Sequence, residues 1–185
     1  MAAEKHSHRV RPLIEATALA RRVGELAAEI ERDYPGSDEL VVIGVLKGAV
    51  FFVADLTRAI RRPLTLDFFQ TSSYGSGTSG GEVRIKRDIE LSIRGRDVLL
   101  VEDIVDTGWT LRTILDLFRF RGAKSVRLCA LLDKHEAREA EVPIDYCGFR
   151  IGREFVVGYG LDYAERYRNL PYIGVVEFTE EEQTS

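Results

Sequence analysis

Three acidic residues stand close together at the end of an apolar run, where they are well placed to do chemistry. Residues 98–101 are all apolar, Glu102 and Asp103 follow directly, and Asp106 comes three residues later. Four consecutive apolar residues favour a buried parallel strand, so we expect the first two acids at its carboxyl end. Carboxylates there can accept hydrogen bonds from sugar hydroxyls, or hold a divalent cation that carries a pyrophosphate.

The residues after Asp106 suit a phosphate group. Thr107, Gly108 and Thr110 lie between the expected strand and a helix whose apolar spacing ends at Phe120. At such a junction backbone N–H groups and the helix dipole converge, while the threonines add hydroxyls and the glycine removes a side chain. The alternative is an ordinary turn in which a threonine only caps the helix. That alternative gives no reason for the three acids.

Apolar patterning predicts an α/β fold in a single domain, residues 1–185. Strand and helix patterns alternate along the chain, which predicts a central, mostly parallel sheet flanked by helices. After Tyr146 we expect shorter strands and loops that close over the sheet edge. The expected elements are a helix over 13–34, a strand over 40–45, a helix over 49–60, and strands over 64–69, 98–101 and 126–132.

Composition limits the classes of partner. The net charge is −4 and the cationic residues are scattered, which argues against nucleic acid and against an anionic membrane. The start has no secretory signal and no segment is long enough to span a membrane, so we expect a cytoplasmic protein. Cys129 and Cys147 have no close cysteine or histidine, so they predict neither a metal site nor a disulfide framework.

The polar ends of the chain are expected to carry no function. His6 and His8 are interpreted as solvated tail residues, and the acidic residues 180–182 as a frayed end.

The glycine-dense segment 71–81 is unusual inside one domain. Gly75, Gly77 and Gly80 match the spacing Gly-x-Gly-x-x-Gly, yet a dinucleotide fingerprint must open a helix, and residues 83–85 favour a strand. Long loops of this composition are more often functional than idle, and glycines let them swing. An idle hairpin tip remains the alternative.

The segment 102–110 resembles the phosphoribosyl-pyrophosphate signature of the phosphoribosyltransferases, and further segments resemble the hypoxanthine and hypoxanthine-guanine branch. The resemblance covers most of the chain from about Leu40. It implies the type I phosphoribosyltransferase fold, with a small hood from about 155–185 and the N-terminal residues. It also implies a flexible catalytic loop at about 71–83, in which Ser73 and Tyr74 close over the reacting centre.

The resemblance also implies roles for the residues that would bind the donor substrate, phosphoribosyl pyrophosphate. Lys47 and Gly48 would bind pyrophosphate after a Leu46–Lys47 bond that is typically cis, and Arg168 would pair with the same group. Mg²⁺ is the implied cofactor, and its ligands would be acidic residues. The donor would contact acidic residues and the threonine loop. The metal ligands would be Glu102, Asp103 and Asp162, and the donor would contact Glu102, Asp103, Asp106, Thr107, Gly108 and Thr110.

The resemblance also implies a purine pocket. Phe155 would stack on the base, Val156 would offer backbone groups to its edge, and Asp162 would also belong to the purine-binding residues. Lys134 would donate to the oxygen at purine position 6, which disfavours adenine because adenine carries an amino group there. Asp106 would act as the catalytic base that takes the proton from purine N7.

The implied activity is purine salvage. A 5-phosphoribosyl group would pass from phosphoribosyl pyrophosphate to hypoxanthine, and to guanine, to give the nucleoside monophosphate and pyrophosphate. The partners would be these small molecules and further copies of the chain in a homodimer or homotetramer. A xanthine-preferring enzyme and a non-catalytic regulator on the same fold are the alternatives. Trp109 departs from the family pattern, and it could wall the phosphate pocket or meet a neighbouring subunit.

Overall fold

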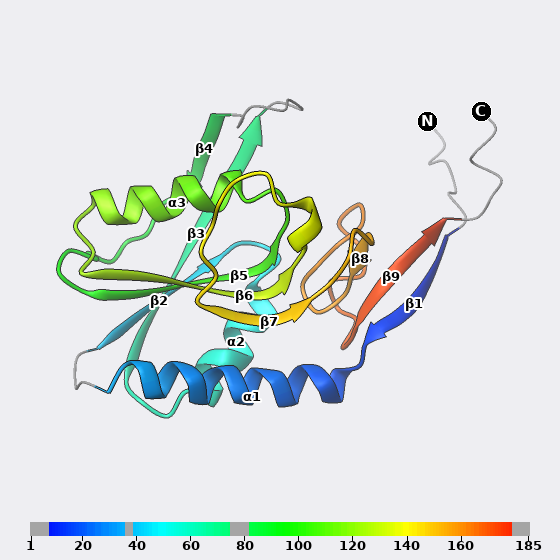
Figure 1. Ribbon diagram of the computed structural model, residues 1–185, viewed down its shortest axis with the longest axis horizontal. Helices are drawn as coiled ribbons and strands as arrows, with labels where there is room; N and C mark the ends of the chain where they lie inside the picture. The colour runs from blue at the N-terminus through cyan, green and yellow to red at the C-terminus, as the bar shows by residue number, and fades with distance from the viewer. Residues whose placement is uncertain (1–7, 36–38, 75–81, 179–185) are drawn as a thin grey trace.

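A computed structural model describes residues 8–35, 39–74 and 82–178. Its centre is a six-stranded sheet in the order β4-β3-β2-β5-β6-β7, in which five strands are parallel and β4 is antiparallel (Figure 1). The α/β fold with a central, mostly parallel sheet is thereby confirmed. Its strands are β2 (Leu40–Val45), β3 (Leu64–Tyr74), β4 (Glu82–Arg87), β5 (Asp97–Val105), β6 (Ser125–Asp133) and β7 (Tyr146–Arg150).

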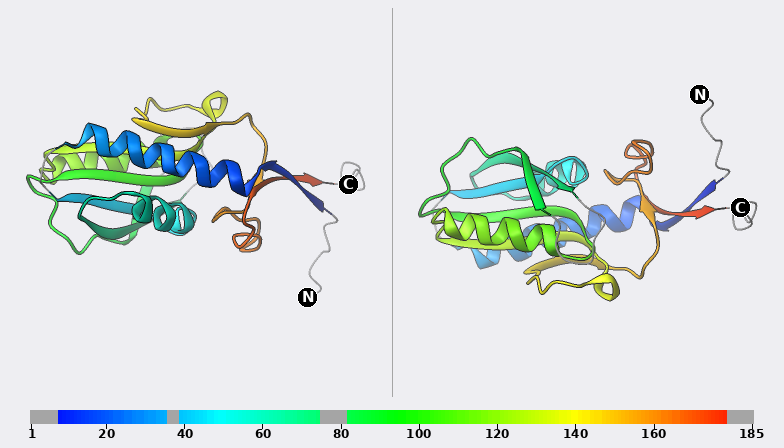
Figure 2. Two further views of the ribbon diagram at one scale, coloured as in Figure 1. Left: turned by 90° about the horizontal axis from the view of Figure 1, so that it is seen from below. Right: turned by 90° about the horizontal axis from the view of Figure 1, so that it is seen from above.

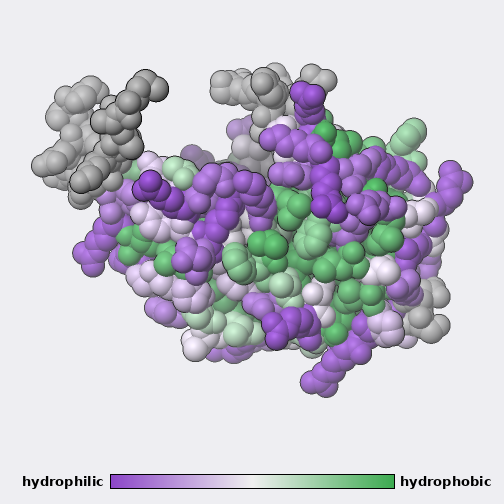
Figure 3. Space-filling model, turned by 180° about the vertical axis from the view of Figure 1, so that it is seen from behind, coloured by the Kyte–Doolittle hydropathy of each residue, from purple (hydrophilic) through white to green (hydrophobic). Residues whose placement is uncertain are grey.

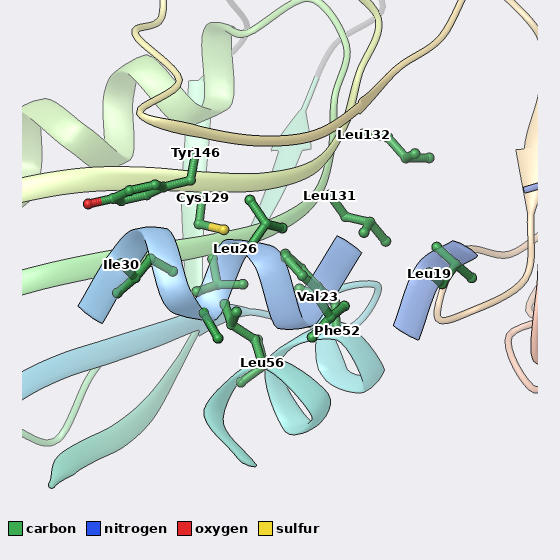
Figure 4. Close-up of a cluster of buried hydrophobic side chains, with 14 of the residues drawn as sticks. Leu19, Val23, Leu26, Ile30, Phe52, Leu56, Cys129, Leu131, Leu132 and Tyr146 are labelled. Carbon is green, nitrogen blue, oxygen red and sulfur yellow. The ribbon is translucent and has the colours of Figure 1, made fainter. Parts of the chain in front are cut away.

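Helices cover both faces of this sheet. α1 (Ala16–Asp33) and α2 (Val50–Ala59) lie on one face, and α3 (Trp109–Phe120) lies on the other (Figures 1 and 2). The strand β2 is therefore buried along its whole length and consists of apolar residues and one glycine. Figure 4 shows how side chains of α1 and α2 meet those of β6 and β7 in one apolar layer. None of the helices in the described residues is long and apolar enough to cross a membrane.

A second, three-stranded sheet stands at one end of the central sheet (Figure 1). It is antiparallel in the order β1-β9-β8, and His8 at its start pairs with Phe178 at its end. Segments from both ends of the chain thus form one structure beside the central sheet, which we name the hood. Its strands are β1 (His8–Ile14), β8 (Val156–Val157) and β9 (Ile173–Phe178).

The N-terminal segment differs from the expectation. The helix expected over 13–34 begins at Ala16, and β1 precedes it. His8 is not a solvated tail residue, because its Nε2 lies 2.7 Å from the hydroxyl of Tyr167. The partner strand of β1 lies far along the chain, so no local pattern could disclose the pairing. His6 and residues 180–182 lie outside the described residues.

Two strands are longer than expected. β3 was expected to end at Phe69 but continues to Tyr74, pairing antiparallel with β4, so Ser73 and Tyr74 lie in a strand. β5 continues past the apolar run to Val105, and Glu102 pairs with Ala130 of β6. A polar residue ends an apolar run, but it does not interrupt backbone hydrogen bonding. The rest of the expected loop, 75–81, lies outside the described residues.

Candidate active site

A cavity of about 370 Å³ lies where the central sheet meets the hood. Ligands of open α/β sheets bind in the crevice beyond the carboxyl ends of the strands, and the cavity occupies such a position. The loops after β2, β5 and β6 form one side, and the hood segment forms the other. Its lining residues are Leu46, Lys47, Gly48, Glu102, Asp103, Ile104, Asp106, Lys134, Phe155, Val156, Leu161, Asp162 and Arg168.

The loop after β2 approaches β5 and the hood segment closely at two glycines, Gly48 in the loop and Gly160 in the hood segment. The Leu46–Lys47 peptide bond is cis, as the family resemblance implies. A Cβ atom on Gly48 would lie 1.6 Å from Oδ2 of Asp103, which is far closer than atoms can approach. A Cβ atom on Gly160 would lie 1.9 Å from the carbonyl oxygen of Gly48, and Gly160 has a φ of +107°. The glycine at 160 therefore lets the hood approach the loop after β2, and the glycine at 48 leaves room for the Asp103 carboxylate.

Glu102 and Asp103 are both buried at the cavity, with 9% and 8% of their surface exposed. The carboxylate Oε1 of Glu102 accepts the N–H of Asp103 at 3.3 Å, and Oδ1 of Asp103 accepts the N–H of Ile104 at 2.9 Å. Burial, and then the neighbouring Asp103, raise the pKa of Glu102 well above its ordinary value. A cation bound beside the two carboxylates would relieve the repulsion between them.

Two cations of the cavity lining, Lys47 and Arg168, are held by acids of the hood segment. Arg168 lies 2.7 Å from the Asp162 carboxylate, and it donates to the carbonyl oxygen of Gly160 at 2.8 Å. Glu165 lies 3.0 Å from Lys47 Nζ and 3.3 Å from Arg168. These contacts, led by the bond from Lys47, lower the pKa of Glu165. The sequence analysis did not identify Glu165, since nothing local links it to a lysine more than a hundred residues earlier.

The residues expected to bind a purine converge on the same cavity. Lys134 is buried directly after β6, with Nζ 3.7 Å from Oδ2 of Asp106. Phe155 is 45% exposed, and its ring meets Tyr163 edge-on at 5.7 Å, while Val156 is buried. Tyr163 is a second residue that the sequence analysis missed. An exposed aromatic face beside a buried ammonium group and a carboxylate suits a flat, polar heterocycle.

Buried polar contacts hold Lys134 in place. Its backbone N–H donates to the carbonyl oxygen of Val105 at 3.0 Å. The preceding residue, Asp133, is buried and hydrogen-bonded to Arg138, and it lies 3.9 Å from Arg150. Asp133 therefore anchors the end of β6, a role that its sequence position beside Lys134 did not reveal.

The threonine loop lies beside Asp106 rather than in the cavity lining described above. Gly108 precedes α3 with a φ of +90°, and a Cβ there would lie 3.0 Å from the carbonyl oxygen of Ala140. The carbonyl of Thr107 accepts the N–H groups of Glu139 and Ala140, at 3.0 and 2.9 Å. Thr110 lies in the first turn of the helix. The loop is thus fixed from outside, with its backbone at a helix N-terminus.

Trp109 is engaged within its own chain. Its indole N–H donates to Oε2 of Glu139 at 3.1 Å, and the guanidinium of Arg112 lies 6.0 Å from the ring centroid. The structure therefore gives Trp109 a place in fastening the 139–140 segment to α3.

The carboxylates fit a divalent cation that arrives with its ligand. Among the described residues, no three His, Cys, Asp or Glu side chains are close enough to hold a metal ion alone. Mg²⁺ keeps several waters and is usually bound by one or two carboxylates together with substrate phosphates. Glu102 and Asp103 supply that number of carboxylates at the cavity, while the Asp162 carboxylate is already paired with Arg168.

The fold and the site define a protein that binds a sugar phosphate or nucleotide at the carboxyl ends of a parallel sheet. The family model described as the phosphoribosyl transferase domain matches residues 13–164. The chain therefore belongs to the phosphoribosyltransferase family, as its sequence signature indicated.

Characterised relatives cover nearly the whole chain. The hypoxanthine-guanine phosphoribosyltransferase of Bacillus subtilis is 51% identical over 166 residues, 89% of this chain and 92% of the relative. The hypoxanthine phosphoribosyltransferase of Haemophilus influenzae is 47% identical over 94% of this chain and 98% of the relative. The bifunctional protein TilS/HprT of Listeria monocytogenes is 51% identical over 173 residues, and this chain spans 26% of its length.

Solved structures agree with this placement. A hypoxanthine-guanine phosphoribosyltransferase from Bacillus anthracis has a TM-score of 0.87 and 46% identity, covering 90% of this chain and 99% of that one. A hypoxanthine phosphoribosyltransferase from Staphylococcus aureus has a TM-score of 0.86 and 43% identity, covering 90% and 91%.

Glu102→Gln should stabilise the protein at high pH. The pKa of Glu102 is raised above its ordinary value of 4.5, so the stability linked to this group is fully present below that value. It is lost as the pH rises through the folded-state pKa. We expect the melting temperature of the variant to exceed that of the parent by at least about 2 °C at pH 8, and by less at pH 4.5.

The control is Glu177→Gln, which removes an exposed carboxylate paired with Arg11 at 2.7 Å. It should give no stabilisation at pH 8. A Glu102→Gln variant that melts below the parent at pH 8 would show that the buried charge stabilises the fold.

Proposed function

We propose that this protein transfers the 5-phosphoribosyl group of phosphoribosyl pyrophosphate to hypoxanthine and to guanine, with release of pyrophosphate. The observation that carries the proposal is one cavity lined by Lys134, Asp106 and Phe155 together with Lys47 and Arg168. We assign the first three residues to a base end, which suits a 6-oxopurine, and the two cations to a pyrophosphate end. The names and the identities of the relatives support the same activity, which serves purine salvage.

The pyrophosphate end acts through fixed cations and backbone. Lys47 and Arg168 place two positive charges at the cavity, and Gly48 brings its backbone to the wall with no side chain between. Glu102 and Asp103 would hold Mg²⁺, which would supply positive charge to the leaving pyrophosphate when bound, while Asp162 stays paired with Arg168. These groups oppose the charge that develops on pyrophosphate as its bond to the ribosyl carbon breaks.

The base end acts through hydrogen bonds and stacking. Phe155 offers a ring face, and Lys134 donates to the oxygen at purine position 6. Asp106 has a half-exposed carboxylate in the lining, and it accepts the proton of N7 as the glycosidic bond forms. The helix N-terminus after Thr107 and Gly108 receives the 5′-phosphate, together with the hydroxyl of Thr110. The ribosyl carbon is thereby held between the base and the leaving group.

The alternatives fit the site less well. A non-catalytic regulator needs neither a buried Lys134 nor an aromatic face beside Asp106. A xanthine-preferring enzyme shares the oxygen at position 6, so its discrimination rests on contacts at purine position 2. The experiment below separates these three functions.

We also propose that the protein forms a homodimer or homotetramer through the side of α2, β3 and β4. Apolar side chains gather near the middle of this side of the molecule (Figure 3). These elements carry four exposed apolar side chains, Val50, Phe51, Leu66 and Ile85, which are 37–43% exposed. Exposed apolar side chains that gather on one side of a molecule are typical of association surfaces.

The test of the proposed function is a steady-state assay with a panel of purines, phosphoribosyl pyrophosphate and Mg²⁺. We expect turnover of hypoxanthine and of guanine, with kcat/KM for adenine at least about tenfold lower, because a buried ammonium would face an amino group. Efficient adenine turnover, a strong preference for xanthine, or no turnover would each reject the proposal.

Lys134→Gln should reduce the ratio of kcat/KM for hypoxanthine to kcat/KM for adenine, because an amide can accept a hydrogen bond as well as donate one. Lys124→Gln is the matched control, since Lys124 pairs with Asp97 at 2.8 Å and precedes the opposite end of β6. It should leave the preference unchanged.

Asp106→Asn should lower kcat by about 10²- to 10⁴-fold with little change in donor affinity, because the amide keeps the size but cannot take a proton. Single-turnover kinetics and a donor titration measure the two quantities separately. Asp116→Asn, which changes an exposed carboxylate 3.1 Å from Arg119 on α3, is the control. Loss of donor binding with kcat preserved would instead assign Asp106 to the phosphate loop alone.

A further inference from the structure

Glu165 forms ion pairs with Lys47 and Arg168, the two cations of the cavity that suit pyrophosphate. One of its carboxylate oxygens, Oε2, lies 3.0 Å from Lys47 Nζ and 3.3 Å from a guanidinium nitrogen of Arg168. A single carboxylate oxygen thus bridges cations from two distant segments, as an oxygen of a bound phosphate would. The Glu165 side chain is 68% exposed, so it can move into solvent at little cost in buried contacts.

The backbone around Glu165 holds the carboxylate in this position. Tyr163 and Arg166 exchange two backbone hydrogen bonds, at 3.1 and 3.0 Å, and so close a tight turn. The two central residues, Ala164 and Glu165, have φ values of +50° and +61°. Turns with positive φ at both central positions favour Asn-Gly, so Ala and Glu are poor choices on local preference alone. The two ion pairs give this glutamate a reason to be there.

The second acid on Arg168 behaves differently. Asp162 lies 2.7 Å from Arg168, and its other oxygen accepts the backbone N–H of Glu165 at 2.9 Å. When Glu165 moves away, Arg168 still has Asp162 as a partner, so the guanidinium remains in place. Lys47 is then released to a new anion. Of the two acids on Arg168, Glu165 is therefore the one whose departure removes a carboxylate from both cations.

We propose that Glu165 is an internal competitor for the pyrophosphate subsite, which binds Lys47 and Arg168 between turnovers and returns to them as pyrophosphate leaves. This inference rests on the proposed function and names a residue that sets the affinity of that site for donor and product. A pyrophosphate carries several negative charges and displaces one exposed carboxylate. Binding is nevertheless weakened, because the ligand must first break two ion pairs.

A positioning role for Glu165 predicts the opposite change in pyrophosphate affinity when its carboxylate is removed. If Glu165 only positioned Lys47 and Arg168 for the ligand, its removal would loosen them and weaken pyrophosphate binding. If it competes, its removal strengthens binding. Measuring the direction of the change therefore separates a competitor from a positioning residue.

The experiment titrates pyrophosphate with MgCl₂ into the parent protein, Glu165→Gln and Glu165→Gly by calorimetry. We expect both variants to bind pyrophosphate about three- to tenfold more tightly, as two exposed ion pairs warrant. The inhibition constant of pyrophosphate as a product should fall by the same factor. Glu165→Gly relieves the left-handed backbone while Glu165→Gln keeps it, so equal tightening in both assigns the effect to charge.

Glu177→Gln is the matched control, because it breaks an exposed ion pair with Arg11 in the hood. It should leave pyrophosphate binding unchanged. Unchanged or weaker binding in both Glu165 variants, with normal binding and turnover in the parent, overturns this inference alone. A parent protein that neither binds pyrophosphate nor turns over a purine overturns the proposed function and this inference together.

Discussion

The site depends on the close approach of three backbone segments at Gly48. This residue lies against the Asp103 carboxylate on one side, and its carbonyl oxygen lies against Gly160 of the hood on the other. A side chain at Gly160 would clash with the backbone of Gly48, and a side chain at Gly48 would push the Asp103 carboxylate out of its place in the site. The contact therefore decides whether Lys47 and Arg168 share a cavity with Asp106 and Lys134, and all four residues line it.

The charges around this contact predict that the site binds an anion together with a cation. Glu102 and Asp103 are buried together, and the cations Lys47 and Arg168 are already paired with acids of the hood segment. Buried carboxylates close to one another disfavour a second anion unless a cation accompanies it. When an anion arrives with Mg²⁺, the cation offsets the negative charge of Glu102 and Asp103 and that of the anion itself. This behaviour is expected of phosphoribosyl pyrophosphate.

Local patterns in the sequence predicted the parallel sheet and the site motifs, and they missed what depends on distant pairing. The apolar runs located β2, β5 and β6, and the motif at Asp106 located one end of the cavity, because both signals are contained in short segments. The pairing of His8 with Phe178, the extension of β3 onto β4, and the bond from Lys47 to Glu165 each join segments that local patterns cannot connect. The sequence also could not show why Gly48 must be glycine, because its φ is ordinary and its constraint is the Asp103 carboxylate. Family resemblance identified Gly48 and Lys134, whereas packing gives their physical reasons.

The measurement that tests this account most directly is the donor affinity of Gly48→Ala. Its new methyl group must displace the Asp103 carboxylate, which is the flexible end of a side chain, so the fold should survive. We predict a melting temperature within about 4 °C of the parent and a dissociation constant for phosphoribosyl pyrophosphate with Mg²⁺ at least about tenfold higher. Gly24→Ala, on the exposed side of α1 with open space around it, is the control and should bind normally. Unchanged donor affinity in a folded Gly48→Ala protein would contradict the claim that this contact builds the site.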